Sequence, residues 1–251
     1  MKFDDSILAV EMTNHCNLRC PMCTQSVTSV PRGYMDFETW KKALDTARMH
    51  QAFLPFALGE SLLHPEFEKM LSYALEKNRQ NRFFHYMTLH TNALLLDEDK
   101  TRVILEHADQ IGTIHFSLDA ASQGVYKKIR VGGLLKTAEA NVMNFLKARS
   151  ELSLEHPHGI IQFIVMKDNQ REAEAFLDRW SVCLSSLGQG YQVNYDWSPP
   201  MVNDTIFFKR ENTWNPNDLK KAEALHKAVA LRLGLIKETE GRILDSDEFV
   251  E

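Results

Sequence analysis

The sequence lacks the features that mark several classes of protein. The chain has 251 residues but only four cysteines, too few for the disulfide framework of a secreted protein of this length. No apolar run approaches the roughly 18 residues that a membrane-spanning helix needs. The net charge is −5, so no overall positive charge favours nucleic acid or an anionic membrane as a partner. These absences favour a globular protein that acts on a small molecule or a neutral peptide.

We also expect no secretion signal at the amino terminus. The stretch "MKFDDSILAVEM" has acids where a signal peptide has a basic flank, and Glu11 interrupts its apolar part. Together with the scarcity of cysteine, this predicts a cytoplasmic protein in a reducing compartment. The length suits one large domain, because α/β barrels often use about 250 residues for a single domain.

Short strand-like runs alternate with longer amphipathic stretches along most of the chain. Each run is rich in β-branched and aromatic residues, and each following stretch has helical periodicity. The predicted strands are 7–12, 53–58, 84–90, 111–119, 160–166 and 191–197, and the predicted helices are 37–49, 65–78, 96–108, 122–130, 136–150 and 170–184. Such alternation predicts an α/β fold with a parallel sheet, either doubly wound or an open partial barrel.

The alternation stops after Pro199 and Pro200. The segment "FFKRENTWNPND" (207–218) is predicted to be a loop, and residues 219–235 are predicted to be one amphipathic helix whose apolar face needs a covering surface. We therefore divide the chain into a barrel at 1–200 and a C-terminal extension at 201–251.

Three of the four cysteines, Cys16, Cys20 and Cys23, stand together in "NHCNLRCPMC". Random placement of four cysteines would produce this spacing in on the order of one in a thousand such sequences. A structural zinc site and an iron–sulfur cluster both normally take four protein ligands. Three thiols therefore indicate a metal centre with one position open for a ligand. A structural zinc site completed by a histidine is the alternative, and an electron carrier without a substrate is a third interpretation.

Polar residues follow the other predicted strands, at the strand ends where parallel α/β folds carry their chemistry. These residues are Gly59, Glu60, Thr91, Asn92, Ser117 and Asp119, with Arg130 further on before two glycines. Each has a structural explanation as well: a solvated loop acid, a turn, a helix cap or a surface arginine. Asp196 and Trp197 end the sixth predicted strand and either line a substrate cavity or pack in the core.

The segment "CNLRCPMC" resembles the cluster-binding loop of radical S-adenosylmethionine (radical SAM) enzymes. Further stretches resemble the strand ends of that family in the same order, particularly in the peptide-modifying branch with a C-terminal SPASM or twitch region. They are "ALGESLLHPEF" (57–67), "HTNALLL" (90–96), "SLDAASQGVYKKIRVGG" (117–133) and "IIQFIVMKDN" (160–169). The resemblance covers roughly residues 7–200, and Ala93 stands where the family usually has glycine.

The resemblance implies a partial (β/α)6 barrel of the TIM type and two cofactors, a [4Fe–4S] cluster and S-adenosylmethionine (SAM). Cys16, Cys20 and Cys23 would bind three irons, and SAM would bind the fourth. Gly59 and Glu60 would hold the SAM ammonium, Ser117 and Asp119 the ribose, and Arg130 the carboxylate, with Thr91 and Asn92 nearby.

The implied reaction is reductive cleavage of SAM to a 5′-deoxyadenosyl radical, which abstracts hydrogen from a peptide or small metabolite. It requires an external low-potential electron donor such as a flavodoxin or ferredoxin. The chain has no cysteine after Cys183, which we expect to be a core residue, so we expect a single cluster per chain. Residues 201–251 are then either the native end or the start of a longer SPASM or twitch region.

Overall fold

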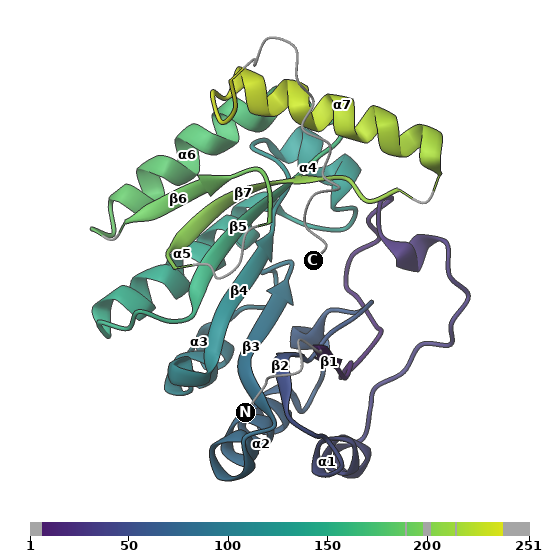
Figure 1. The fold of residues 1–251 in the computed structure, drawn as a ribbon, viewed down its shortest axis with the longest axis vertical. Coiled ribbons are helices and arrows are strands. Elements are labelled where there is room, and N and C mark those ends of the chain that lie inside the picture. Colours follow the sequence, from purple (N-terminus) through teal and green to yellow (C-terminus); the bar gives the residue numbers. More distant parts are fainter. Residues whose placement is uncertain (1–6, 189, 198–201, 214, 238–251) are drawn as a thin grey trace, which may run out of the picture.

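One open sheet of seven parallel strands forms the centre of the molecule (Figure 1). The structure is a computed structural model that describes residues 7–188, 190–197, 202–213 and 215–237. The strands lie in the order β1-β2-β3-β4-β5-β7-β6, and every neighbouring pair is parallel. The fold is therefore the partial α/β barrel that the sequence predicted.

The strands and helices alternate as expected. The strands are β1 (Ile7–Ala9), β2 (His50–Leu54), β3 (Phe84–Thr91), β4 (Ile111–Ser117), β5 (His158–Val165), β6 (Tyr191–Asn194) and β7 (Asp204–Arg210). The helices are α1 (Phe37–Asp45), α2 (Phe67–Asn81), α3 (Glu98–Glu106), α4 (Gln123–Ile129), α5 (Leu135–Glu151), α6 (Ala173–Ser185) and α7 (Pro216–Arg232). Asp97 caps α3 by accepting a hydrogen bond from the Lys100 amide (2.9 Å).

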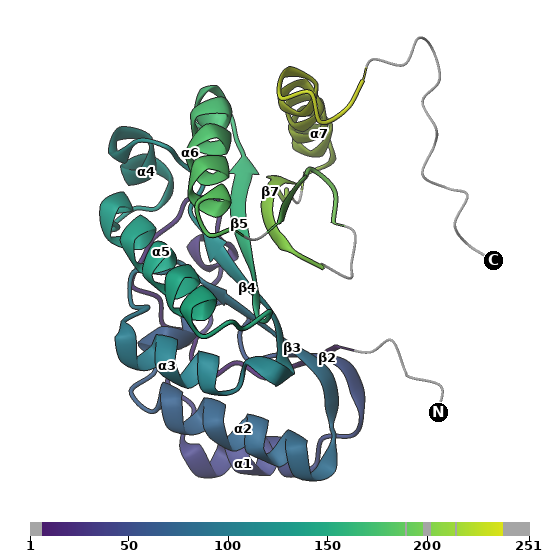
Figure 2. The ribbon, with the colours of Figure 1, turned by 90° about the vertical axis from the view of Figure 1, so that its left-hand side faces the viewer.

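The helices α1 to α6 cover one face of the sheet and leave the other face concave (Figure 2). The main hydrophobic core lies between these helices and the sheet, and it includes Phe116, Phe163 and Trp180. A separate small cluster, Ile160 and Phe207, comes from neighbouring strands. Since side chains alternate between the faces of a strand, each strand also sends every second residue toward the concave face.

The strand β7 corrects the sequence analysis, which predicted a loop from residue 207. It lies between β5 and β6, so the sheet residues lie on both sides of the proposed domain boundary at 200. Ile206 and Phe208 of β7 are fully buried, whereas Lys209 and Arg210 are half-buried at its carboxyl end. Because of this charged pair and the preceding prolines, the segment resembles a loop in the sequence. Its partner strand β5 is more than 30 residues away in the sequence. The boundary itself stays a prediction.

The C-terminal helix α7 packs on the sheet through β7 and β5. Its buried residues include Val229, Ala230 and His226, and the ring nitrogen Nε2 of His226 lies 2.8 Å from the backbone oxygen of Phe208. The sheet therefore covers the apolar face that the sequence left without a partner. Among the residues that the structure describes, no helix combines the length and apolar character that a bilayer-spanning segment requires.

Candidate functional site

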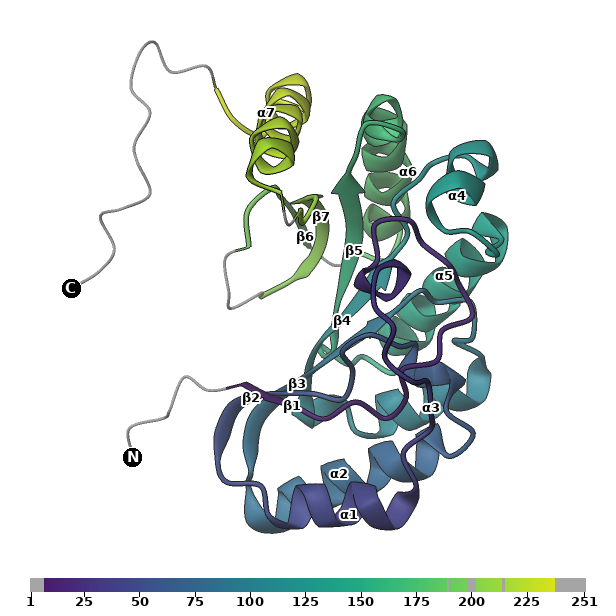
Figure 3. The same cartoon turned by 90° about the vertical axis from the view of Figure 1, so that its right-hand side faces the viewer.

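The three clustered cysteines lie on the long connection between β1 and α1, which crosses the end of the sheet (Figure 3). Cys20 is buried, and Cys16 and Cys23 are half-buried. A turn closes the second half of the loop, where the Cys23 amide donates to the Cys20 carbonyl at 3.1 Å. A cavity of about 540 Å³ borders Cys23 and Met22 on one side and the segment from β7 to α7 on the other.

The three cysteine sulfurs do not all lie as close together as the ligands of one metal ion do. Among the described residues, the three cysteines do not form a group whose ligand atoms all lie within 4.8 Å of one another. Four thiolates around a zinc ion stand about 3.8 Å apart, because each Zn–S bond is about 2.3 Å long. In a cluster each thiolate binds a different iron, so the sulfurs are further apart.

Two of the sulfurs already accept hydrogen bonds of the kind that tune iron–sulfur clusters. The Leu18 amide donates to Cys16 Sγ at 3.4 Å, and Arg130 Nη1 donates to Cys20 Sγ at 3.6 Å. Burial raises the pKa of Cys16 to about 11. Burial also raises the pKa of Cys20, and the neighbouring Arg130 guanidinium opposes this shift. Metal binding is therefore what would hold these buried thiols as thiolates.

Gly59 brings the segment after β2 against the start of the cysteine loop. A Cβ atom on Gly59 would lie 1.9 Å from the backbone oxygen of Thr13, so only glycine fits this approach. The next amide, of Glu60, donates to the His15 carbonyl at 2.8 Å. On the other side, the carboxylate of Glu11 accepts hydrogen bonds from the amides of Leu58 and Gly59, the second at 2.6 Å.

The Glu60 carboxylate is buried and joins this segment to the end of β3. It accepts hydrogen bonds from Thr91 Oγ1 (2.9 Å) and from the Asn92 amide (2.8 Å). Burial raises the pKa of Glu60, and these two hydrogen bonds counteract the shift. Asn92 in turn donates from Nδ2 to Asn17 Oδ1 (2.8 Å), inside the cysteine loop. Ala93 follows with a φ of 63°, the left-handed conformation that explains why glycine suits this position.

Asp119 and Arg130 form a buried ion pair beside Cys20. Arg130 Nε donates to Asp119 Oδ2 at 2.8 Å, and Nη2 bonds the same oxygen. The other oxygen of Asp119 accepts from the Ile164 amide at 2.6 Å, so this carboxylate also connects β4 to β5. The sequence analysis assigned each of these residues to SAM, whereas the structure first pairs them with each other. Their contacts with SAM stay predictions.

A second cavity, of about 740 Å³, occupies the concave face of the sheet. Its lining includes Thr88, His90, His115, Gln162, Trp197 and Lys209. Trp197 and Asp196 therefore line a cavity, which was one of the two interpretations left open for them. Ser117 is at the carboxyl end of β4, where its hydroxyl accepts from Gln162 Nε2 at 3.4 Å. Asn212 borders both this cavity and the one beside Cys23, so the two spaces adjoin.

Aromatic and imidazole rings cross the concave cavity in a continuous row. Phe56 stacks on His90 with ring centroids 4.2 Å apart, His90 stacks on His115 at 4.0 Å, and Trp197 follows His115 at 5.1 Å. Neither ring nitrogen of His115 has a hydrogen-bond partner among the described residues, although the side chain is only 3% exposed. A buried polar ring without partners indicates that a ligand or water completes its hydrogen bonding.

Burial keeps these histidines neutral. Burial, with a smaller effect of Lys209, lowers the pKa of His90 to about 3. The pKa of His115 also lies well below its usual value because of burial, His90 and Lys209. Burial lowers the pKa of Lys209 as well, and this lysine has no salt bridge to any residue that the structure describes. The cavity thus combines neutral rings with a lysine that forms no salt bridge within the described part of the chain.

The sequence analysis missed Glu11, Asn17 and the cavity residues His90 and Lys209. Glu11 had one visible signal, since it is an acid that interrupts an apolar strand. His90 and Lys209 gave none, because they come from strands more than 100 residues apart and meet only across the concave face.

The sequence profile of the radical SAM superfamily matches residues 10–178. This match spans the cysteine loop, Gly59 and Glu60, and the ends of β3 and β4. The chain belongs to the radical SAM superfamily. As a radical SAM protein it is an enzyme, and its cofactors are a [4Fe–4S] cluster and SAM. The zinc interpretation of the cysteine loop is not favoured.

Two relatives with named activities match this radical SAM protein. The tungsten-containing aldehyde ferredoxin oxidoreductase cofactor-modifying protein of Pyrococcus furiosus is 25% identical over 96% of this chain. The PqqA peptide cyclase of Gluconobacter oxydans is 30% identical over 53% of this chain. The matched regions span 66% and 35% of those proteins' own lengths, so both continue beyond the part that corresponds to this chain.

Solved structures support the fold. Native anSMEcpe with bound AdoMet has a TM-score of 0.53 at 21% identity, covering 81% of this chain and 50% of that chain. HydG, a maturase of the [FeFe]-hydrogenase, has a TM-score of 0.53 at 10% identity, covering 90% of this chain and 49% of that chain. At these identities the likeness concerns the arrangement of the radical SAM barrel alone.

Proposed function

We propose that this radical SAM enzyme cleaves SAM reductively at the carboxyl end of the sheet and removes a hydrogen atom from a substrate held in the concave cavity. The observation that carries the proposal is the hydrogen-bonded network that joins the cysteine loop to the segment after β2 and to the ends of β3 and β4. When bound, the cluster and SAM supply a 5′-deoxyadenosyl radical. The residues of this chain bind, orient and shield them.

In this proposal Cys16, Cys20 and Cys23 bind the three irons, and Arg130 stabilises the thiolate of Cys20. The oxygens of Asp119 already accept bonds from Arg130 and the Ile164 amide, so Asp119 contributes chiefly by positioning Arg130. Ser117, at the carboxyl end of β4, remains the candidate for the ribose. Thr91 and Asn92 hold Glu60 in place.

Glu60 has capacity left for the SAM ammonium. A carboxylate offers about four lone-pair positions, and the described residues donate three hydrogen bonds to Glu60, from Thr91, Asn92 and Leu62. We expect Glu60→Gln to weaken SAM binding by about 1.5–3 kcal/mol, because it removes a charge-assisted hydrogen bond. Isothermal titration of the reconstituted protein with SAM measures the change.

The exposed acid Glu106 on α3 provides a control for this substitution. Glu106→Gln should leave SAM binding unchanged, and both variants should keep the full iron content. A SAM dissociation constant in Glu60→Gln equal to that of the wild type would rule out the assigned role.

The concave cavity suits a substrate that has a planar ring and a carboxylate. The row of neutral rings offers a surface on which a further ring can stack, and His115 offers one donor and one acceptor. Lys209 supplies the positive charge, because the neighbouring Arg210 is already paired with Glu223 at 2.6 Å. A small metabolite or the side chains of a peptide can each present this combination.

We expect Lys209→Met to weaken the binding of 3-(4-hydroxyphenyl)propionate at least about tenfold, since it removes one charge-assisted hydrogen bond. Binding of the corresponding uncharged amide should not change. Tryptophan fluorescence reports the binding, because Trp197 lines the cavity. Lys127→Met, on the exposed side of α4, is the control. Equal loss of acid and amide binding in Lys209→Met would contradict a role for the charge.

An external low-potential donor, such as a flavodoxin or ferredoxin, is part of the proposal, because the reaction needs one electron for each SAM cleaved. The dithionite-reduced protein should cleave SAM without such a partner, and a flavodoxin with its reductase should replace dithionite. A protein that forms 5′-deoxyadenosine under neither condition would contradict the proposed function.

A further inference from the structure

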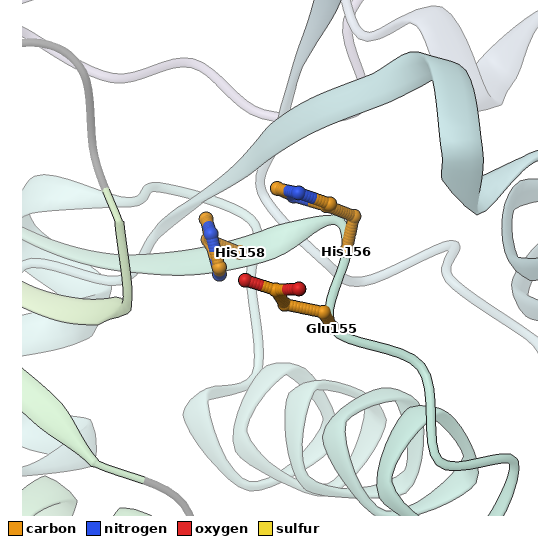
Figure 4. A group of neighbouring side chains, drawn as sticks. All are labelled: Glu155, His156 and His158. Carbon is orange, nitrogen blue, oxygen red and sulfur yellow. The ribbon is translucent and has the colours of Figure 1, made fainter.

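A second group of metal-binding side chains lies away from the cysteine loop. Glu155, His156 and His158 stand just before β5 and at its first residue, whereas the Asp119–Arg130 pair contacts β5 near its other end, at Ile164. The ligand atoms of the three side chains all lie within 4.8 Å of one another, and no other group of three such residues does so in the part of the chain that the structure describes. Figure 4 shows them gathered around the start of β5.

The backbone that carries these ligands is held by a buried ion pair. Arg149 Nη1 donates to the Pro157 carbonyl at 2.8 Å and to Asp204 Oδ1 at 2.7 Å. The same Asp204 oxygen accepts from the Gly159 amide at 2.7 Å. The peptide groups on both sides of His158 are therefore tied to α5 and β7. The backbone position of His158 is thereby fixed, which lowers the conformational entropy that binding a metal ion would cost.

One ligand atom of the site lacks a hydrogen-bond partner among the described residues, and free space borders the other two ligands. The Nδ1 atom of His156 is buried and has no hydrogen-bond partner among the described residues. His158 is only 4% exposed, and it lines a cavity of about 440 Å³ together with Glu155, Ser150 and Asn203, whereas His156 is not among the residues that line this cavity. This cavity has room for a metal ion and a bound water.

We propose that Glu155, His156 and His158 bind a divalent transition metal ion of the zinc type. Two imidazoles and one carboxylate form a ligand set that zinc uses with a fourth position open, whereas Mg²⁺ and Ca²⁺ prefer oxygen ligands only. Ligand atoms around zinc stand about 3.3 Å apart, since each bond is about 2.0–2.2 Å long. The Glu155 side chain is exposed, so it can move until its carboxylate lies at this distance from the two imidazoles. The site is independent of the cluster and of SAM.

The test uses the full chain with its cluster reconstituted anaerobically, so that the cysteines are occupied. Zinc is added, unbound metal is removed by gel filtration, and zinc and iron per chain are measured by mass spectrometry. We expect about one zinc per wild-type chain. Competition with a chromophoric chelator should show that Glu155→Gln and His158→Ala each weaken zinc binding at least about tenfold. The iron content should not change, which separates this result from any failure of the cluster site.

The exposed acid Glu151, at the end of α5, is the matched control, and Glu151→Gln should bind zinc like the wild type. Magnesium should not compete with zinc. Because Glu155 is exposed, Glu155→Gln still tests the site if the His158 variant fails to fold. A wild-type chain that retains no zinc, or a Glu155→Gln variant with wild-type zinc affinity, would overturn the proposal.

Discussion

Replacing Cys20 with alanine should abolish assembly of the cluster. Cys20 is the most buried of the three clustered cysteines and the one whose sulfur Arg130 contacts. With Cys16 and Cys23 alone, the chain would offer two thiolates where the proposed site needs three. Iron and sulfide analysis after anaerobic reconstitution, with the visible absorbance of the cluster, should show about four irons in the wild type and almost none in Cys20→Ala.

The fourth cysteine, Cys183, provides the matched control for this experiment. It is half-buried on α6 and packs against the main core, whereas the sequence analysis expected a residue within the core. Cys183→Ala should therefore keep the full cluster. Cys20→Ala should remain folded by circular dichroism, because its loop lies outside the sheet. A Cys20→Ala protein that holds about four irons would refute the assignment, and a wild type with about eight would refute the prediction of one cluster.

Replacing Gly59 with alanine should disrupt both the site and the fold around it. The added methyl group would lie 1.9 Å from the Thr13 oxygen and 2.8 Å from Asn14 Cα and the His15 oxygen. All three are backbone atoms, so they can yield only if the cysteine loop and the segment after β2 move apart. Overpacking of this kind costs about 1–3 kcal/mol of the free energy of unfolding. Urea denaturation measures this loss.

The same movement would break the hydrogen bond from the Glu60 amide to His15, so we expect Gly59→Ala also to weaken SAM binding at least about tenfold. Gly190→Ala is the control, because no atom of the described residues, apart from its neighbours in the chain, lies within 4 Å of the Cβ position at Gly190. It should change the free energy of unfolding by less than about 1 kcal/mol. Gly59→Ala and Gly190→Ala proteins with equal stability would contradict the steric argument.

Local patterns in the sequence predicted much of this protein. The strands β3, β4 and β5 follow from runs of β-branched and aromatic residues, and the helices α2 and α6 follow from helical periodicity. The strand β7 was missed because Lys209 and Arg210 resemble loop residues until the cavity and Glu223 account for their charges. Periodicity reports the burial of a strand, but it does not report which strand lies beside it.

The site also has features that the local sequence predicted and features that only the fold created. The spacing of Cys16, Cys20 and Cys23 is local, so the sequence by itself was enough to indicate the radical SAM superfamily and to predict that these thiols bind one centre. Only the tertiary structure decided that Asp119 pairs with Arg130, that Glu60 joins Thr91 to the cysteine loop, and that His90, His115 and Lys209 share one cavity. These contacts link residues that are 11 to more than 100 positions apart. Their partners depend on strand order and register, which arise when the whole sheet buries its apolar surface against the helices.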